Sequence, residues 1–165
     1  MTNQQIAEDL LAKYGETVKT FEEPWGLLTF TTNRQNIISV LEYLKNHETF
    51  RFNFLTDLTG IHLPENTGAE FGVIYHLHSL ENNVRVRIKV FLSKDDLHIP
   101  TAIPVWASAN WMERETYDFF GVLFDGHPKL MRILNIEEMD YFPMRKEYPL
   151  EDATREDKID ALFGR

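Results

Sequence analysis

Two neighbouring stretches of the sequence alternate between apolar residues and mostly polar or small ones. Apolar side chains recur at every second position of residues 71–80 and again of residues 84–92. A period of two predicts β-strands, and the Asn82-Asn83 pair between them suits a two-residue hairpin turn because Asn tolerates positive φ. The resulting register places two apolar pairs on one face and two polar pairs on the other: Leu77 with Ile88, Tyr75 with Val90, His78 with Arg87, and His76 with Lys89.

Three other stretches carry apolar residues at helical spacing, which predicts amphipathic helices. They are residues 4–14, 33–47 and 104–120. The first helix should end at Gly15, the second should begin at Asn33 as its N-cap, and the third should begin at Pro104 and end at Gly121. The expected apolar stripes of the first two helices are Ile6, Leu10 and Leu11, then Ile37, Val40, Leu41 and Leu44.

The remaining segments complete a prediction of one α+β domain. Strands are expected at three further places, and a loop follows the hairpin: 17–22, 25–31 and 52–61 for the strands, with a turn at Glu23-Pro24, and 93–103 for the loop. We therefore predict a domain over residues 1–134 with a largely antiparallel or mixed sheet packed with helices. Residues 135–165 have many charges and few apolar anchors, so they should form an extended tail that is disordered or lies along a partner.

Composition narrows the possible functions. The 165-residue chain has 17 Lys and Arg against 26 Asp and Glu, a formal net charge of -9, and no cysteine. The negative charge disfavours nucleic acid and anionic lipid as partners. The lack of thiols excludes disulfides, thiolate-held iron–sulfur clusters and cysteine-type zinc sites. No apolar run approaches the roughly 20 residues needed to span a bilayer, so we expect an untargeted cytoplasmic chain without membrane insertion.

The predicted third helix carries a charge within an aromatic stripe. This stripe consists of Trp106, Ala109, Glu113, Tyr117 and Phe120. A carboxylate at Glu113 needs a cation or hydrogen-bond donors, or it takes up a proton. It can reach solvent at the helix edge, meet an Arg or Lys of another chain, or act as a general acid or base. Arg114 and Asp118, four residues apart, are expected to pair on the flank.

Histidines offer the other candidate chemistry. His76 and His78 share a strand face at a spacing that can bind a metal, but their expected neighbours are cations, which favours an ordinary polar face. His127 stands between Gly126 and Pro128, where a lone histidine more often holds backbone groups than performs catalysis. The sequence contains no glycine-rich dinucleotide fingerprint, phosphate-binding lysine loop or Gly-x-Ser-x-Gly elbow.

A family resemblance spans roughly Arg51 to Leu150 and is most specific in the third helix. The run from Glu113 to Val122 closely resembles the signature of the C subunit of bacterial respiratory complex I, the proton-translocating NADH:quinone oxidoreductase. Further segments resemble the same family in the same order along the chain: residues 55–59, 124–128, 132–134 and 143–150. The sequence departs from the family pattern at Lys129, Met131 and Tyr141-Phe142.

The resemblance implies a structural subunit of the hydrophilic arm, peripheral to the cytoplasmic face of the inner membrane. In that family the protein packs against the large quinone-site subunit and the small cluster-bearing subunit. It holds no cofactor or metal itself, while other subunits hold FMN, iron–sulfur clusters, NADH and quinone. Candidate contact residues on the third helix, the His127 turn and the tail are Glu113, Arg114, Glu115, Tyr117, Asp118, His127, Arg132, Arg145 and Lys146.

Three alternatives stay open at this point. The first is the equivalent subunit of a related membrane-bound hydrogenase or ferredoxin-linked complex. The second is a free-standing metal hydrolase that uses His76, His78 and His127. The third is a generic binding module without a redox link.

Overall fold

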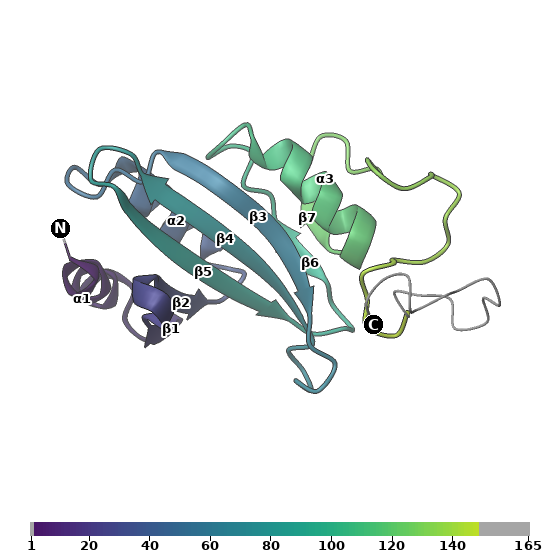
Figure 1. Ribbon diagram of the computed structural model, residues 1–165, viewed down its shortest axis with the longest axis horizontal. Helices are drawn as coiled ribbons and strands as arrows, with labels where there is room; N and C mark the ends of the chain where they lie inside the picture. Colours follow the sequence, from purple (N-terminus) through teal and green to yellow (C-terminus); the bar gives the residue numbers. More distant parts are fainter. Residues whose placement is uncertain (1, 149–165) are drawn as a thin grey trace, which may run out of the picture.

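The computed structural model describes residues 2–148, which form one α+β unit with a mixed sheet (Figure 1). Short 3-10 turns lie at Gly15–Thr17 and Pro24–Gly26. The helices and strands, in chain order, are α1 (Asn3–Tyr14), β1 (Val18–Glu22), β2 (Leu28–Thr32), α2 (Ile37–Asn46), β3 (Phe54–His62), β4 (Phe71–Ser79), β5 (Val84–Leu92), β6 (His98–Pro100), α3 (Ala109–Phe120) and β7 (Leu123–Asp125).

The main sheet has five strands in the order β1-β2-β5-β4-β3. Strands β2 and β5 run parallel, whereas the other neighbours run antiparallel, so the sheet is mixed as predicted. The short strands β6 and β7 pair in parallel next to it. Figure 1 shows α2 behind β4 and β5, and α3 beyond the β3 edge.

The hydrophobic core lies between one face of this sheet and the helices. The stripe predicted for α2 is confirmed, because all four of its residues are fully buried. In α1, Ile6 and Leu10 are buried, but Leu11 is 45% exposed. The α1 stripe is therefore narrower than predicted, and Leu11 lies on its outer side.

The β4–β5 hairpin has the predicted faces but a different register. Tyr75 pairs with Ile88 and His76 with Arg87, a shift of two residues from the predicted pairing. The cause is the turn, which spans residues 80–83 instead of Asn82-Asn83 alone, with Asn83 at a φ of 51°. A shift of two keeps every side chain on its predicted face, since the side-chain period of a strand is two.

Two predicted helices begin later than expected. Helix α2 begins at Ile37, because the Asn33 side chain accepts a hydrogen bond from the Asn36 amide and stabilises a preceding turn instead. Helix α3 begins at Ala109, because residues 102–106 form a turn in which the Trp106 amide donates to the Ala102 carbonyl. Pro104 lies in that turn and is not the first residue of the helix.

Two strand predictions also need correction. The second strand begins at Leu28 and not at residue 25, since Pro24–Gly26 forms a turn with Trp25 at a φ of 57°. The segment 93–103 is not all loop, because His98–Pro100 forms β6 and pairs with β7. Strand β6 depends on its pairing with β7, a neighbour distant in sequence, which a local pattern does not reveal.

Candidate docking site at the end of the third helix

A buried carboxylate near the end of α3 organises the chain that follows the domain core. Asp118 is fully buried, and one carboxylate oxygen accepts hydrogen bonds from three successive backbone amides, at 2.8–3.0 Å. These amides belong to Ile133, Leu134 and Asn135. The other oxygen accepts from the Arg132 guanidinium at 2.8 Å and from the Asn135 amide group at 3.1 Å.

These donors determine the charge state of Asp118. Burial alone would raise the pKa of this carboxyl group, but the amide donors and the Arg132 guanidinium outweigh it and hold the pKa well below its usual range. Asp118 is therefore a carboxylate with a full set of donors. The predicted flank pair with Arg114 is wrong, because the Arg114 guanidinium donates to the Met131 and Arg132 carbonyls.

Arg132 carries this network further along the chain. Its guanidinium is buried and donates to the carbonyls of Met139 and Tyr141 at 2.7 and 2.8 Å. It also lies over the Phe142 ring, 5.1 Å from the ring centroid. Arg132 thus links α3 to the end of the loop that Arg132 itself begins. We call residues 131–148 the return segment.

Arg145 and Phe142 fix the later half of the return segment. The Arg145 guanidinium donates to the Phe120 carbonyl at 2.9 Å and lies over the rings of Phe71 and Phe142. Phe142 in turn packs edge-on against Tyr117. Gly121, in the left-handed region with a φ of 79°, ends α3 directly beneath these side chains. Only a residue without a Cβ fits there unless Arg145 and Phe142 move.

Lys146 contacts the domain through its backbone. Its amide donates to Nδ1 of His62, which is buried and stacks on the Phe71 ring. The exposed Lys146 side chain remains at the surface. The described part of the predicted tail therefore lies along its own domain, and residues 149–165 of that tail lie outside the described residues.

The outer side of the return segment exposes large apolar residues among charged ones such as Glu137, Glu138 and Asp140. Leu134 is 65% exposed and Ile136 is 68% exposed, although both belong to a segment fixed by buried hydrogen bonds. Several further large apolar residues of the segment and of α3 are exposed: Tyr141, Met144, Tyr148 and Trp111. The sequence-based selection missed these residues. The sequence shows these apolar residues between prolines and charged residues, but only the fold shows which of them face outwards.

Glu113 lies deeper than the sequence suggested. Its side chain is fully buried, and its carboxyl group accepts hydrogen bonds from the Thr101 hydroxyl and the Ala102 amide, both at 2.6 Å. Burial raises the pKa of Glu113 to about 7, although both hydrogen bonds oppose this shift. The interpretation as a helix edge that reaches solvent is wrong, and in this structure Glu113 also offers no surface to a partner.

The other predicted contact residues divide into structural and exposed groups. His127 accepts a hydrogen bond from the Lys129 amide, and its Nε2 lies 3.2 Å from the Asn110 carbonyl. This pattern confirms that His127 holds backbone groups in its turn. Glu115 is exposed on α3, and Tyr117 is half-buried against Phe142.

His76 and His78 share a sheet face, as predicted, but each has a neighbour from within the chain. Arg87 donates to Nε2 of His76 at 2.8 Å, and Nε2 of His78 lies 3.3 Å from the Asn83 side-chain oxygen. Within residues 2–148, no group of three or more His, Cys, Asp or Glu side chains is placed to hold a metal ion. His127 lies in the turn after β7 and does not join the other two histidines.

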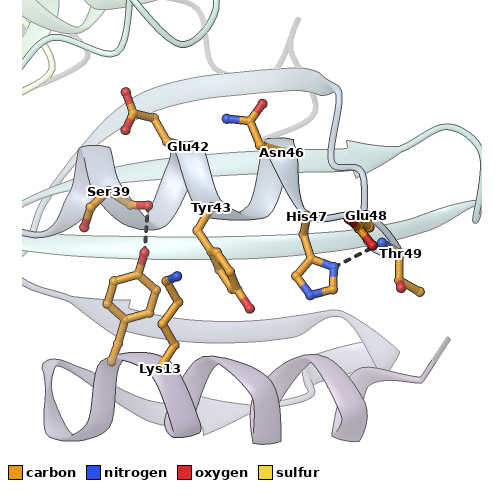
Figure 2. Close-up of a pocket in the computed structure, with 9 residues that line it drawn as sticks. Lys13, Ser39, Glu42, Tyr43, Asn46, His47, Glu48 and Thr49 are labelled. Atoms are coloured by element: carbon orange, nitrogen blue, oxygen red, sulfur yellow. Dashed lines mark hydrogen bonds between the residues drawn. The ribbon is translucent and has the colours of Figure 1, made fainter.

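An open groove of about 640 Å³ lies between α1 and α2 (Figure 2). The Tyr43 hydroxyl donates to Asp9, and the Lys13 ammonium group lies 4.1 Å from the Tyr43 ring centroid. Burial, together with the Asp9 carboxylate, raises the pKa of Tyr43 to about 12. The Tyr14 hydroxyl donates to the Ser39 carbonyl, so these contacts bind α1 to α2.

Comparison with known proteins gives a consistent result. Residues 30–154 match the family described as the respiratory-chain NADH dehydrogenase 30 kDa subunit. The chain is 43% identical over 125 residues to the C subunit of the NADH-quinone oxidoreductase of Nocardioides sp., covering 76% of this chain and 50% of that protein. It is 38% identical over 155 residues to the C subunit of the Citrifermentans bemidjiense enzyme, covering 93% of this chain and 94% of that protein. The chain thus spans about half the length of the Nocardioides relative and nearly all of the Citrifermentans one.

Solved structures show the same fold. A trypsin-resistant fragment of Nqo5 aligns with a TM-score of 0.67 and 30% identity, covering 79% of this chain and all of that fragment. A chain of an archaeal membrane-bound sulfane sulfur reductase aligns with a TM-score of 0.75 over 89% of this chain and 85% of that chain. Its identity of 24% shows a shared fold alone. In the described residues, every helix is too short or too polar to cross a bilayer.

Proposed function

Since this chain belongs to the respiratory-chain NADH dehydrogenase 30 kDa subunit family, we propose that it is a structural subunit of an NADH-quinone oxidoreductase. The complex transfers electrons from NADH through iron–sulfur clusters to quinone and couples this transfer to proton translocation. The chain itself contributes contacts and no redox chemistry.

The composition and the geometry support a non-redox role. Without cysteine, this chain has no thiolate with which to hold an iron–sulfur cluster. Its buried charges are used to hold its own backbone: Asp118 and Arg132 bind amides and carbonyls of the return segment. FMN, clusters, NADH and quinone accordingly belong to other subunits, and this chain lies with them on the cytoplasmic face of the inner membrane.

The observation that carries the proposal is the outer side of the return segment. Leu134 and Ile136 expose apolar side chains from a backbone that Asp118 and Arg132 hold in place. A rigid segment loses little conformational entropy on binding, and exposed apolar side chains on it suit the core of a protein interface. We assign this surface, with Trp111 of α3, to the contact with the quinone-site and cluster-bearing subunits.

Co-purification of a tagged full-length chain with the other subunits tests this assignment. Ile136→Glu replaces a 68% exposed apolar side chain of the proposed contact with a charge. It should reduce the recovered quinone-site and cluster-bearing subunits by about ten-fold or more, since burying an unpaired charge costs more than 1.4 kcal/mol. Quantitative mass spectrometry of the eluted complex measures the ratio of subunits. Glu113 is unsuitable for such a charge substitution, because its side chain lies in the core.

Leu11→Glu is the matched control, because Leu11 is also an exposed apolar residue but lies on α1. Assembly of this variant should equal that of the wild-type chain. Circular dichroism of both purified variants establishes that they fold. Equal recovery of partner subunits with Ile136→Glu and Leu11→Glu would exclude the return segment as the docking surface.

A further inference from the structure

The sheet has a second face that none of the helices covers. The helices pack on the face that carries Val73, Tyr75 and Ile88, which are fully buried. The opposite face is turned towards the viewer in Figure 1, where no described helix or strand lies in front of β4 and β5. On this face Arg85 is exposed and Arg87 and Lys89 are half-buried, so these long side chains are accessible to another molecule, whereas shorter ones such as Ile74 are buried beneath them.

The central strand of this face carries a line of cations. Arg85, Arg87 and Lys89 occupy alternate positions of β5, so all three project from the same side. On the neighbouring strand β4, His78 lies opposite Arg85 and His76 lies opposite Arg87. We call Arg85, Arg87 and Lys89 the cationic face; His76, which accepts a hydrogen bond from Arg87, is a neutral neighbour of it.

Carboxylates are scarce around these cations. Across the sheet, Arg87 is aligned with Glu22 on the outer strand β1 and with Asp57 on the outer strand β3. Asp57 lies 3.5 Å from His76. The residues aligned with Arg85 and Lys89 on the paired strands include no Asp or Glu. In the turn that follows β4, Glu81 pairs with Arg51 at 2.9 Å. Within residues 2–148, none of the three β5 cations forms an ion pair with a carboxylate.

This arrangement is costly for an isolated chain. Alternate residues of a strand lie about 6.6 Å apart, so neighbouring cations repel each other. The chain has a formal net charge of -9, and yet three of its 17 Lys and Arg residues stand together on one strand. An external group of carboxylates would relieve the repulsion and convert it into specific attraction.

We propose that the cationic face binds a carboxylate-rich segment of a neighbouring protein subunit. The inference rests on the proposed function in one respect, namely that this neighbour belongs to the same complex. Phe54, 46% exposed and paired with His78, adds an apolar contact at the β3 edge of the same face. The partner surface is separate from the return segment, which lies at the end of α3 on the helix side of the sheet.

A protein fits this face better than a nucleic acid does. Single-stranded nucleic acids stack their bases on successive exposed aromatic rings, and the exposed ring of this face, Phe54, lies at its β3 edge and not beside the three cations. The centre of this face carries Ile74 and Thr29, which are 6% and 1% exposed beneath the longer side chains. The negative charge of the whole chain also opposes the approach of a phosphate backbone.

Binding by the isolated full-length chain tests the chemistry of the face directly. The probe is a fluorescein-labelled poly-L-glutamate peptide, followed by fluorescence anisotropy at low and high salt. Arg85→Glu/Lys89→Glu should weaken binding by about ten-fold or more, because two attractive contacts become repulsive. Lys13→Glu/Lys94→Glu makes the same change in net charge at exposed positions away from the cationic face and should bind like the wild-type chain.

Two results of this measurement would overturn the proposal. One is equal affinity of the two double variants for the peptide. The other is tighter binding of a single-stranded oligothymidylate than of poly-L-glutamate to the wild-type chain, because this would make the face a nucleic-acid site. Binding that weakens as salt increases and is lost only in the Arg85→Glu/Lys89→Glu variant would support it.

A second measurement separates this inference from the proposed function. The tagged wild-type chain should recover the other subunits of the complex, and Arg85→Glu/Lys89→Glu should recover several-fold less while Lys13→Glu/Lys94→Glu recovers the full amount. If even the wild-type chain recovers none of them, the proposed function fails and the peptide measurement still decides the chemistry of the face. If the Arg85→Glu/Lys89→Glu variant recovers as much as the wild-type chain, the cationic face makes no contact with another subunit.

Discussion

Glu113 and Asp118 lie five residues apart on α3 and are both fully buried, yet their pKa values move in opposite directions. Burial raises the pKa of Glu113 to about 7, because only the Thr101 hydroxyl and the Ala102 amide donate to it. Burial acts on Asp118 in the same direction, but three amides, a guanidinium and a side-chain amide donate to it and lower its pKa. Burial and hydrogen-bond donors act in opposite directions on both carboxylates, and only at Asp118 do the number and charge of the donors outweigh burial.

The two carboxylates therefore have different structural consequences. Ionised Asp118 anchors the return segment, and through it the proposed docking surface. The Glu113 side chain lies between α3 and residues 101–102. A negative charge on it lowers the stability of the fold at neutral pH. The following predictions separate the two effects, with Glu115→Gln, an exposed acid on the same helix, as their common control.

Asp118→Asn should have the largest effect. Every hydrogen-bond partner of this carboxylate is a donor, so an Asn side chain would direct its own amide hydrogens at other donors. Breaking a buried ion pair in this way should destabilise the fold by about 3–5 kcal/mol. Urea denaturation measures the loss, and hydrogen exchange should show faster exchange at the amides of Ile133 to Asn135. Unchanged protection of these amides would mean that Asp118 does not hold the return segment.

Glu113→Gln should change the pH dependence of stability. The folded-state pKa of about 7 lies above the ordinary value of 4.5, so the folded chain binds more protons between these values and stability falls as the pH rises. From pH 5 to pH 8 the wild-type chain should lose about 2–3 kcal/mol relative to the variant. The pKa of Asp118 is lowered, so its contribution is fully present above its unfolded value and is constant over this range.

The measurement is the free energy of unfolding of both chains and of Glu115→Gln at several pH values. Every other titratable group is present in both chains, so its contribution cancels in the difference from Glu113→Gln. Parallel curves for the wild-type chain and Glu113→Gln would show that Glu113 is ionised in the folded state at pH 5.

Gly121→Ala tests the packing of the return segment with a smaller expected effect. A Cβ at this position would lie 2.5 Å from an Arg145 nitrogen and 2.7 Å from a Phe142 ring carbon. Gly68→Ala is the matched control, because its φ of 81° resembles the 79° of Gly121 and a Cβ there would meet nothing within 4 Å. Both variants carry the same backbone strain, so the additional cost at Gly121 should be about 1–3 kcal/mol. Equal thermal stability of the two variants would show that Arg145 and Phe142 yield without cost.

The contrast between Glu113 and Asp118 also shows what a local sequence pattern cannot predict. The helical spacing of the sequence was enough to show that Glu113 and Asp118 each need a partner for their charge. Their partners come from residues up to 17 positions away, in segments whose path no periodicity describes. For the same reason the Arg114–Asp118 pair, predicted from helical spacing, is wrong: Arg132 pairs with the carboxylate at 2.8 Å, and Arg114 donates to backbone carbonyls instead.

The sequence by itself determined the strands of the hairpin and their two faces, the buried stripe of α2, the end of α3 at Gly121 and the absence of thiolate chemistry. These features follow from side-chain period, from the positive φ that glycine tolerates and from composition. Tertiary structure alone decided the hairpin register, the late start of α3, the charge states of Glu113 and Asp118, and the path of the return segment. A period of two leaves a shift of two residues undetermined, and a buried charge is stabilised by whichever donors the folded chain brings to it.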